Sequence, residues 1–428
     1  MKNGNLTLLT WMDYMKDGDN LTSFSRVINK KHEYIFNNGE IVIKKLKREC
    51  QFLKSIKPSL YRSEQIITMD LETKEIIVED RRVMSPVCVS IYDGKEMKSF
   101  YISNFSSKDE MLNSSISYLM KRKYSNYKIY LHNFSYFDGI FLMKSLSGLA
   151  DKLIPIIRDG RIIDLKFKYN KHTLHFRDSY LLIPSSLTKL ATNFNVENKG
   201  IFPYKFINDS NIEMNYNGSI PPFYYFTNIS IEQYNLYCDS FKDKDWNLKE
   251  ELIKYCEQDV KTLYQVIDVF SKDIFKLFRI DVIKYPTLSS LAFAIYRSKF
   301  LTNLNIPLIN GEIYKDIKQG YTGGAVDVYN PSGENVYRYD VNSLYPFVMK
   351  EYPMPIGKPI YFEGDILETD PKAFGFFEAE VIIPKDLNIP ILQCKIKTPK
   401  GGIRTLAPLG SWKGVFFSEE IKKSITLG

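Results

Sequence analysis

Two carboxylates stand two positions apart at Asp70 and Glu72, inside the run QIITMDLET, and they form the only Asp-x-Glu in the chain. Residues two apart on a β-strand project from the same face, so we expect both carboxylates to point the same way. Two anions held side by side repel each other unless a cation lies between them, which is how hard divalent metals are bound. The pair therefore predicts a metal site, with a solvent-facing strand edge as the simpler alternative.

Two further acids stand downstream, each with a polar partner at a defined spacing. Asn133 and Asp138 in HNFSYFDG follow the strand-like run KIYLHN, and the carboxyl end of a strand is where α/β sheets build their sites. Tyr255 and Asp259 in YCEQD are four residues apart and share one face of a predicted helix. For the first pair, an Asn turn followed by an Asp helix cap is the structural alternative.

The four acids and the tyrosine together form a set that can hydrolyse a phosphodiester. Such carboxylates bind two Mg²⁺ or Mn²⁺ ions about 3.5–4 Å apart, one generating a hydroxide and the other stabilising the leaving 3′ oxygen. The Tyr255 hydroxyl would orient the attacking water. The Tyr-x-x-x-Asp spacing by itself is weak evidence, because it recurs at Tyr264/Asp268 and Tyr361/Asp365, where we predict structural roles. The order of the three segments along the chain is what favours catalysis.

An α/β fold has to position these side chains. The β-branched runs at 65–73 and 85–93 are separated by turn residues and predict a hairpin. Residues 247–278 carry apolar side chains at helical spacing and predict one long amphipathic helix. Strands followed by helices that pack over them indicate an α/β or α+β layer fold. After residue 285 we expect a helical connector, a glycine-rich turn and a second strand-rich stretch.

The composition excludes several classes of protein. The 428 residues suffice for two or three domains, and 58 Lys and Arg against 50 Asp and Glu give a net charge of +8, which is compatible with a polyanionic partner. No apolar run is long enough to span a membrane, and the first residues resemble neither a secretion signal nor a mitochondrial presequence. Scattered cysteines and only four histidines argue against a zinc module or a disulfide framework. We predict buried, reduced thiols at Cys50, Cys88, Cys238, Cys256 and Cys394.

One more aspartate stands in RYDVNSLYPFVM, residues 338–349. We expect Asp340 to be buried at the end of a strand, because the run before it is apolar. The Asn, Ser and Pro that follow predict a turn. Taken alone, a strand end followed by a turn explains this stretch.

In this order, the motifs resemble those of the family B DNA polymerases, in particular the protein-primed branch found in linear plasmids and phages. Asp70-Leu-Glu72, Asn133…Phe137-Asp138 and Tyr255…Asp259 resemble the three 3′→5′ exonuclease motifs of the proofreading domain. The resemblance implies an α/β fold with a ribonuclease H-like exonuclease domain, followed by an incomplete α+β polymerase palm. The implied metal ligands are Asp70, Glu72, Asp138, Asp259, Asp340 and Val341.

The resemblance also assigns roles to other residues of the exonuclease region. SSLTKL resembles the (Ser/Thr)-Leu-x-x-hydrophobic motif, so Ser186 and Leu187 would contact the single-stranded 3′ end. KGIF resembles the Lys-x-x-hydrophobic motif, so Lys199 would assist phosphodiester cleavage. Asn133, and Phe137 by stacking, would hold the frayed primer.

Polymerase motifs follow further along the chain. YTGG resembles the Tyr-x-Gly-Gly motif that links the two domains, where Tyr321, Gly323 and Gly324 would let the backbone approach template phosphates; a plain tight turn is the alternative. DVNSLYP resembles motif A, which implies that Asp340 would bind the catalytic metals through its side chain and Val341 through its carbonyl. The implied nucleotide-binding residues are Ser343 and Leu344, by their amides at the triphosphate, and Tyr345, whose ring selects deoxynucleotides.

The motifs predict four regions. These are a basic amino-terminal extension (1–60), the exonuclease domain (61–280), a helical connector (281–320) and the start of the palm (321–428). Neither the family's triphosphate-gripping lysine helix nor its second metal aspartate is found after Asp340. A two-metal transfer site with one carboxylate strand would bind Mg²⁺ poorly. We therefore expect no polymerisation by this chain alone.

The expected cofactors are two Mg²⁺ or Mn²⁺ ions in the exonuclease site, and the expected partner is DNA, as a single-stranded 3′ end or a primer-template. A deoxynucleoside triphosphate would bind only if the missing palm is supplied. The branch implies a terminal protein and a carboxy-terminal polymerase chain as further partners, and no membrane. It implies a location in the mitochondrial matrix, or otherwise in the cytoplasm with a plasmid or phage replicon. A free-standing DNA exonuclease and a non-catalytic DNA-binding remnant remain alternatives.

Overall fold

The structure of the protein is a computed structural model. It describes residues 51–427 except 210, 228, 243, 303–305, 325–327, 329, 358, 388, 389 and 400. For residues 51 and 369, and for three strands before residue 46, it describes the backbone alone. The chain divides into two compact units. One consists of Ser55–Thr302, and the other combines the residues up to Lys54 with those from Asn303.

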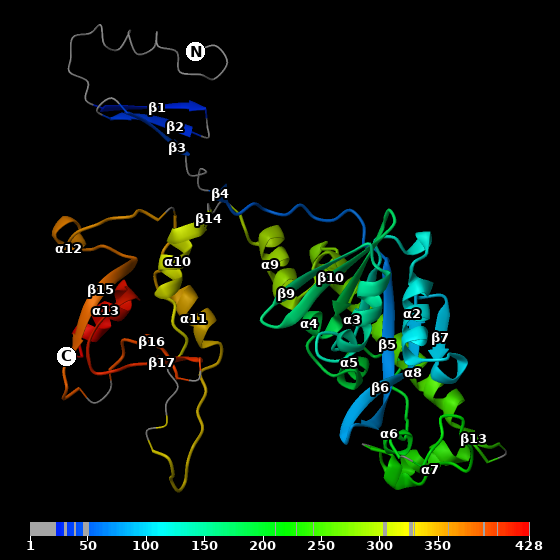
Figure 1. The fold of residues 1–428 in the computed structure, drawn as a ribbon. Coiled ribbons are helices and arrows are strands. Elements are labelled where there is room, and N and C mark those ends of the chain that lie inside the picture. Colours follow the sequence, from blue (N-terminus) through cyan, green and yellow to red (C-terminus); the bar gives the residue numbers. More distant parts are fainter. Residues whose placement is uncertain are drawn as a thin grey trace. The chain divides into compact units, whose positions relative to one another are not determined.

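The unit Ser55–Thr302 is built on one seven-stranded mixed sheet (Figure 1). Its strands are β5 Ile66–Val78, β6 Arg81–Tyr92, β7 Met97–Tyr101, β8 Lys128–Leu131, β9 Lys152–Arg158, β10 Arg161–Tyr169 and β11 His172–Asp178. They lie in the order β7-β6-β5-β8-β11-β10-β9. The pairs β5/β8 and β8/β11 are parallel, and the other pairs are antiparallel.

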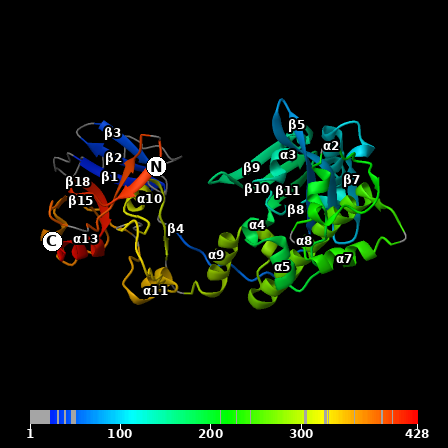
Figure 2. The same ribbon diagram turned by 90° about the horizontal axis from the view of Figure 1, so that it is seen from below.

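Helices cover both faces of this sheet. The helices α2 Lys108–Leu119 and α3 Asp138–Leu149 pack on one face, and α8 Leu248–Phe278 packs on the other (Figure 2). Side chains alternate along a strand, so β5 sends Met69 and Leu71 into the core under α2 and α3. Asp70 and Glu72 therefore point to the face covered by α8.

Shorter elements complete this unit. They are α4 Ser179–Leu182, α5 Leu187–Asn193, α6 Tyr204–Ile207, α7 Ile231–Asp239, α9 Leu288–Lys299, β12 Asn217–Gly218, β13 Trp246–Asn247 and the 3₁₀ turns Ile102–Asn104, Arg122–Tyr124, Phe223–Tyr225 and Val282–Lys284.

The two elements that the local sequence predicts most directly, the β5-β6 hairpin and the helix α8, are confirmed. β5 and β6 form an antiparallel hairpin that turns at Glu79 and Asp80, both with positive φ. The long helix α8 begins after Asn247, whose side chain accepts the Glu250 N–H at 3.1 Å.

A buried ion pair ties β10 to β11. The Asp164 carboxylate accepts from Arg177 Nε at 2.6 Å and contacts His175 Nδ1 at 2.8 Å. Arg177 also donates to the Ile283 carbonyl at 2.5 Å. Burial alone would raise the pKa of Asp164, but hydrogen bonds and positive charge from His175 and Arg177 hold it below its ordinary value.

Replacing Asp164 with alanine is expected to lower the free energy of unfolding at pH 7 by about 3 kcal/mol, because Arg177 would be left buried without its counter-charge. Since the Asp164 pKa is depressed in the folded state, this stabilisation is present above the ordinary carboxyl pKa and is lost as the pH falls below about 4. Urea denaturation at pH 7 and pH 3 measures both values, with Asp273→Ala at an exposed position of α8 as the control. An undiminished difference between variant and wild type at pH 3 would contradict the charge argument.

The other unit contains small two- and three-stranded sheets. Its strands are β1 Ser23–Asn29, β2 His32–Asn37, β3 Glu40–Lys45, β4 Gln51–Phe52, β14 Pro307–Leu308, β15 Phe376–Ile383, β16 Cys394–Lys397, β17 Ile403–Leu406 and β18 Gly410–Phe417. The pairings are β1-β2-β3, β4-β14, β15-β18 and β16-β17. Its helices are α10 Gly311–Gln319, α11 Leu344–Glu351, α12 Ile366–Thr369 and α13 Ser418–Ile425. The buried core here is small and centres on Ile383, Leu392 and Phe416.

Several features of the structure differ from what the sequence predicts. Residues 1–60, which composition predicts to be a simple extension, contain the antiparallel sheet β1-β2-β3; residues 1–22 lie outside the described residues. The predicted connector 281–320 contains α9 and α10, but these helices fall in different units. Within the described residues, no helix combines the length and apolar character that crossing a bilayer would require.

The predictions for the thiols and for Asp340 are partly wrong. Cys88 and Cys256 are buried and free, whereas Cys238 and Cys394 are free but only half-buried; Cys50 lies outside the described residues. Asp340 is exposed and lies in no strand. An apolar run becomes a buried strand only if another strand hydrogen-bonds to it, and no strand among the described residues pairs with residues 337–341.

Candidate active site

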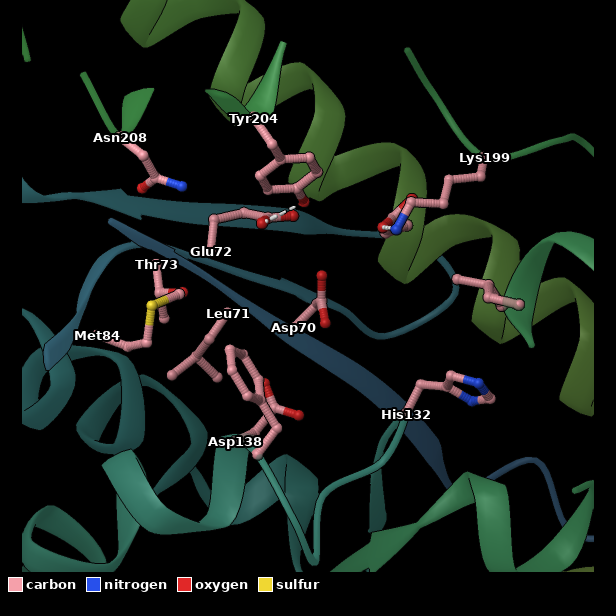
Figure 3. A pocket seen from close by; sticks show the side chains of 13 residues that line it. Asp70, Leu71, Glu72, Thr73, Met84, His132, Asp138, Lys199, Tyr204 and Asn208 are labelled. Atoms are coloured by element: carbon pink, nitrogen blue, oxygen red, sulfur yellow. Dashed lines mark hydrogen bonds and ion pairs between the residues drawn. The ribbon is translucent and has the colours of Figure 1, made fainter. Parts of the chain in front are cut away.

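A cavity of about 310 Å³ lies in the unit Ser55–Thr302, against β5 and α8 (Figure 3). Its walls carry all four acids singled out from the sequence, Asp70, Glu72, Asp138 and Asp259, together with Lys199. Segments almost 190 residues apart in the chain therefore place their carboxylates in one space.

Local structure explains how three of these acids reach the cavity. Asp70 and Glu72 share the face of β5 that α8 covers, because they are two residues apart. Asp138 is the first residue of α3, where the helix dipole favours a negative side chain. Gly139 lets this helix start close to the preceding loop, since a Cβ there would lie 2.6 Å from the Phe134 carbonyl oxygen.

The carboxylates are held in a buried and mutually repulsive environment. Burial, followed by the negative charges of the other three acids, raises the pKa of Asp70 well above its ordinary value. Burial raises the pKa of Glu72 to about 8 and that of Asp138 to about 7. Burial is the largest cause of all three shifts, because it disfavours the charged form of a carboxyl group, and neighbouring negative charges add to it.

Two buried carboxylate oxygens show which kind of ligand the cavity fits. Asp138 Oδ1 and Asp259 Oδ1 are buried, and neither has a hydrogen-bond partner within the described part of the chain. An unpaired buried carboxylate oxygen is costly, so a bound partner is expected. Hard divalent cations are the partners that carboxylate oxygens suit best. The residues present therefore fit Mg²⁺ or Mn²⁺.

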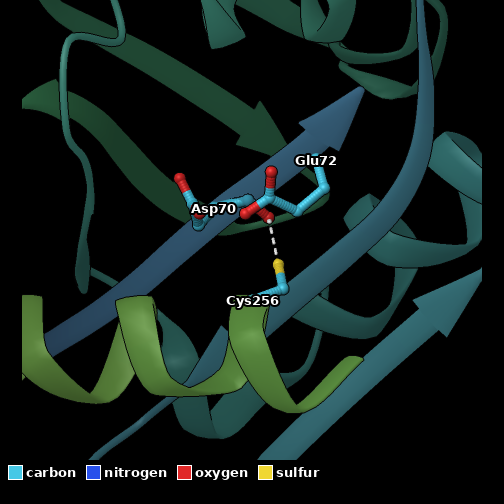
Figure 4. Close-up of side chains that lie close together, drawn as sticks. All are labelled: Asp70, Glu72 and Cys256. Atoms are coloured by element: carbon cyan, nitrogen blue, oxygen red, sulfur yellow. Dashed lines mark hydrogen bonds between the residues drawn. The ribbon is translucent and has the colours of Figure 1, made fainter. Parts of the chain in front are cut away.

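A thiol lies next to two of these carboxylates. One ligand atom each from Asp70, Glu72 and Cys256 lies within 4.8 Å of the others (Figure 4). The Cys256 thiol donates a 3.6 Å hydrogen bond to the backbone carbonyl of Asp70. Its contact with the strand backbone helps to fasten α8 against β5.

Two residues of the segment after α5, Lys199 and Tyr204, contact the acids with an ammonium group and a hydroxyl group. Lys199 Nζ lies 2.7 Å from Asp259 Oδ2 and 5.0 Å from the centre of the Tyr255 ring. Burial alone would lower the pKa of Lys199, but the Asp259 carboxylate raises it above its ordinary value. The Tyr204 hydroxyl donates to Glu72 Oε2 at 2.5 Å, and its ring meets that of Tyr255 edge-on.

A buried aspartate on β11 shapes the loop that leads to Asp138. The Asp178 carboxylate accepts the backbone N–H groups of Asn133 and Ser135, both at 3.0 Å, and that of Tyr180 at 2.9 Å. Asn133 adopts a positive φ of 70°, which asparagine tolerates better than most residues. Asp178 therefore fixes the backbone between β8 and α3 from a different strand.

Three residues at or beside the cavity are not predicted from the sequence: Tyr204 and His132, which line it, and Asp178. Tyr204 stands five residues after Lys199 in KGIFPYKF, where a tyrosine among apolar residues reads as core. Asp178 is the last residue of a strand, where the sequence predicts a turn residue. Only contacts between distant segments identify their roles.

The residues predicted to contact single-stranded DNA, and the predicted catalytic residue Tyr255, lie in the cavity wall or directly behind it. Phe137 and Leu187 line the cavity. Ser186 is exposed at the start of α5, Asn133 is half-buried in the loop, and Tyr255 is buried behind Lys199. The last three lie next to lining residues without themselves forming the wall.

The predicted polymerase residues lie in the other unit and form no closed site among the described residues. Val341, Leu344 and Tyr345 are exposed, as is Asp340, and Ser343 precedes α11 with a positive φ. Tyr321, Gly323 and Gly324 are also exposed. A Cβ on Gly324 would lie 3.3 Å from the Tyr345 hydroxyl, so the Tyr-x-Gly-Gly segment and the motif A segment are neighbours.

The fold is similar to that of known DNA polymerases. An orthorhombic crystal form of Phi29 DNA polymerase matches with a TM-score of 0.53 at 18% identity, over 84% of this chain and 58% of that chain. Phi29 DNA polymerase complexed with primer-template DNA matches with a TM-score of 0.52 at 17% identity, over 84% and 57% of the two chains. At this level of identity the similarity shows a shared mixed α/β fold.

The sequence comparison defines the family. The family described as DNA polymerase type B, organellar and viral, matches residues 118–428. The chain is 41% identical to a probable DNA polymerase of Neurospora intermedia, over 96% of this chain and 46% of that protein. It is 35% identical to a probable DNA polymerase of Ascobolus immersus, over 98% of this chain and 36% of that protein. The chain belongs to the organellar and viral type B DNA polymerases, and it spans less than half the length of these curated relatives.

Proposed function

We propose that this chain carries the 3′→5′ exonuclease of a type B DNA polymerase and removes nucleotides from single-stranded 3′ ends of DNA. The observation that supports this most strongly is the convergence of four carboxylates, from β5, α3 and α8, on one cavity that also contains a lysine. The order of these residues along the chain and the family membership support the same function.

In this mechanism the carboxylates would hold two Mg²⁺ or Mn²⁺ ions, which supply a hydroxide nucleophile and neutralise charge at the scissile phosphate. Tyr204 orients the Glu72 carboxylate by its hydrogen bond. Lys199 stays protonated beside Asp259 and presents its ammonium group to the developing negative charge of the phosphate. Tyr255, packed under Lys199, would orient the attacking water with its hydroxyl.

The substrate we propose is a frayed single strand. The side chains of Phe137 and Leu187 offer apolar surfaces in the cavity wall, and bases bind such surfaces without sequence preference. A volume of about 310 Å³ lies at the lower end of ligand pockets, which suits the end of a strand better than a duplex. One of the similar structures is a complex with primer-template DNA, which agrees with DNA as the ligand.

Polymerisation needs more than these residues provide. After Asp340 the sequence contains no Asp-x-Asp, and Asp340 is exposed. We propose that the second metal-binding strand, and with it nucleotide binding at Ser343, Leu344 and Tyr345, depends on polymerase segments that this sequence does not include. Priming by a terminal protein and a role on a mitochondrial or plasmid replicon follow from the branch resemblance alone.

The proposed activity predicts shortening of a 5′-labelled single-stranded oligonucleotide into a ladder when the purified chain and Mg²⁺ are present. EDTA should stop the reaction, and Mn²⁺ should restore it. A phosphorothioate at the 3′-terminal linkage should block shortening, whereas the same group at the 5′ end should not. Binding of DNA without shortening under either metal would instead favour the non-catalytic remnant.

A further inference from the structure

One end of the cavity is formed by residues that the mechanism above does not use. Asn208, Met84 and Thr73 line the wall there, on the other side of Asp70 from His132 (Figure 3). Asn208 follows directly after α6, the short helix that also carries Tyr204. This end of the cavity therefore lies beside the acids but contributes no carboxylate of its own beyond Glu72.

The orientation of the Asn208 amide follows from its partner. The backbone N–H of Glu75 donates to Asn208 Oδ1 at 2.8 Å. A backbone N–H can only donate, so the atom that faces it has to be the amide oxygen, and the NH₂ group is turned the other way. Within the described residues, no acceptor bonds to Asn208 Nδ2, and Figure 3 shows this nitrogen on the side of the cavity. The cavity thus contains a hydrogen-bond donor without a protein partner.

Neighbouring contacts hold this donor in place. Lys74 Nζ donates to the Ile212 carbonyl at 3.1 Å, so the segment after α6 is fastened to β5 at a second point. The Tyr225 hydroxyl donates to Asp209 Oδ2 at 2.9 Å and fixes the same segment from its other side. A donor held before the ligand arrives binds with less loss of conformational entropy than a mobile one.

We propose that Asn208 donates a hydrogen bond to the 3′-terminal nucleoside of the strand bound in this cavity, with Met84 packing against the same nucleoside. The proposal rests on the exonuclease function and adds a residue that determines how the end of the substrate is recognised. A donor needs an acceptor, and the minor-groove edge of every base offers one, N3 in purines or O2 in pyrimidines. A contact made only by donation therefore accepts all four bases, as removal of any mismatched nucleotide requires. Methionine adapts its shape to purines and pyrimidines alike.

Equilibrium binding tests this contact separately from catalysis. The probes are fluorescein-labelled pentanucleotides with phosphorothioate linkages throughout, one for each 3′-terminal base, and the readout is fluorescence anisotropy with Mg²⁺ present. Asn208→Ala should weaken binding about fivefold to tenfold for all four probes, the effect of losing one hydrogen bond. An unchanged Kd in this variant would overturn the proposal.

A second variant separates recognition from a structural role. Asn208→Asp keeps the acceptor for the Glu75 N–H but has no NH₂ group, so it should bind at least as weakly as Asn208→Ala. If Asn208 only supported the fold, Asn208→Asp would bind like the wild type once high salt screens its added charge, and that result would also overturn the proposal. The added charge is controlled by Asn113→Asp on the exposed side of α2 and by repeating the measurement in high salt, which screens charge but spares the loss of a hydrogen bond.

Kinetics with unmodified DNA distinguish this proposal from the function on which it rests. Asn208→Ala should raise KM about fivefold to tenfold and change kcat less than twofold, since the contact holds the substrate end. A wild type that cleaves DNA while both Asn208 variants keep its KM would contradict this inference alone. A wild type that neither binds nor cleaves the oligonucleotides would contradict the exonuclease function as well.

Discussion

Replacing Asp70 with asparagine is expected to slow exonucleolytic cleavage at least about 10³-fold and to leave the metal-free fold at least as stable as the wild type. Activity falls because the cluster loses the carboxylate that lies among the other three. Stability does not fall because Asp70 is destabilised by burial and by the three neighbouring negative charges. An amide of the same shape removes that repulsion. Loss of function would thus come without loss of folding.

Cleavage rates and thermal melting at pH 8, each with and without Mg²⁺, measure both parts of this prediction. Mg²⁺ should raise the Tm of the wild type, since a ligand that binds only the folded state stabilises it, and should raise the Tm of the variant much less. Asp273→Asn makes the same substitution at an exposed position of α8 and should change neither quantity. A variant that melts well below the wild type without metal would show that Asp70 supports the fold, against the repulsion argument.

Replacing Lys199 with methionine is expected to reduce both activity and stability. The rate should fall about 10²-fold or more, the loss typical when one charge-stabilising group is removed from a transition state. The free energy of unfolding should fall by about 2 kcal/mol, because the Asp259 carboxylate, 4% exposed, would lose its 2.7 Å ion pair. This expected loss of stability is smaller than that for a fully buried ion pair, because the Lys199 side chain is 35% exposed.

A double-mutant cycle separates the two effects of Lys199. Adding Asp259→Asn to Lys199→Met should restore most of the lost stability, since no unpaired charge is left, but should not restore cleavage. Lys261→Met breaks the surface pair between Lys261 on α8 and Glu197 in the segment after α5, and it should alter stability by less than about 1 kcal/mol. If the double variant were as unstable as Lys199→Met, packing of the lysine chain rather than its charge would explain the loss.

The candidate site could be predicted to a large extent because its parts are encoded locally. Asp70 and Glu72 share a strand face through a two-residue period, and Tyr255 and Asp259 share a helix face through a four-residue spacing. The β5-β6 hairpin and α8 follow from the same short-range periodicities. These periodicities depend only on backbone geometry, which neighbouring residues determine.

Other features depend on residues that are distant in the sequence. The sequence predicts a core position for Tyr204, whereas in the structure its hydroxyl donates a hydrogen bond to Glu72. The sequence predicts a turn residue at Asp178, whereas its carboxylate accepts hydrogen bonds from the loop before α3. Asp340 reads as a buried strand end, yet it is exposed because no strand of the described residues pairs with it. Burial likewise separates Cys88 and Cys256 from the half-buried Cys238 and Cys394.

The sequence by itself determined which residues we propose for the chemistry and on which face of its own strand or helix each one lies. Only the tertiary structure decided that β5, α3 and α8 share one cavity, that Lys199 pairs with Asp259, and that the Asn208 amide turns its NH₂ group inward. The physical reason is the range of the interactions. Backbone geometry acts over a few residues, whereas burial, ion pairs and hydrogen bonds between segments depend on how distant parts of the chain pack together.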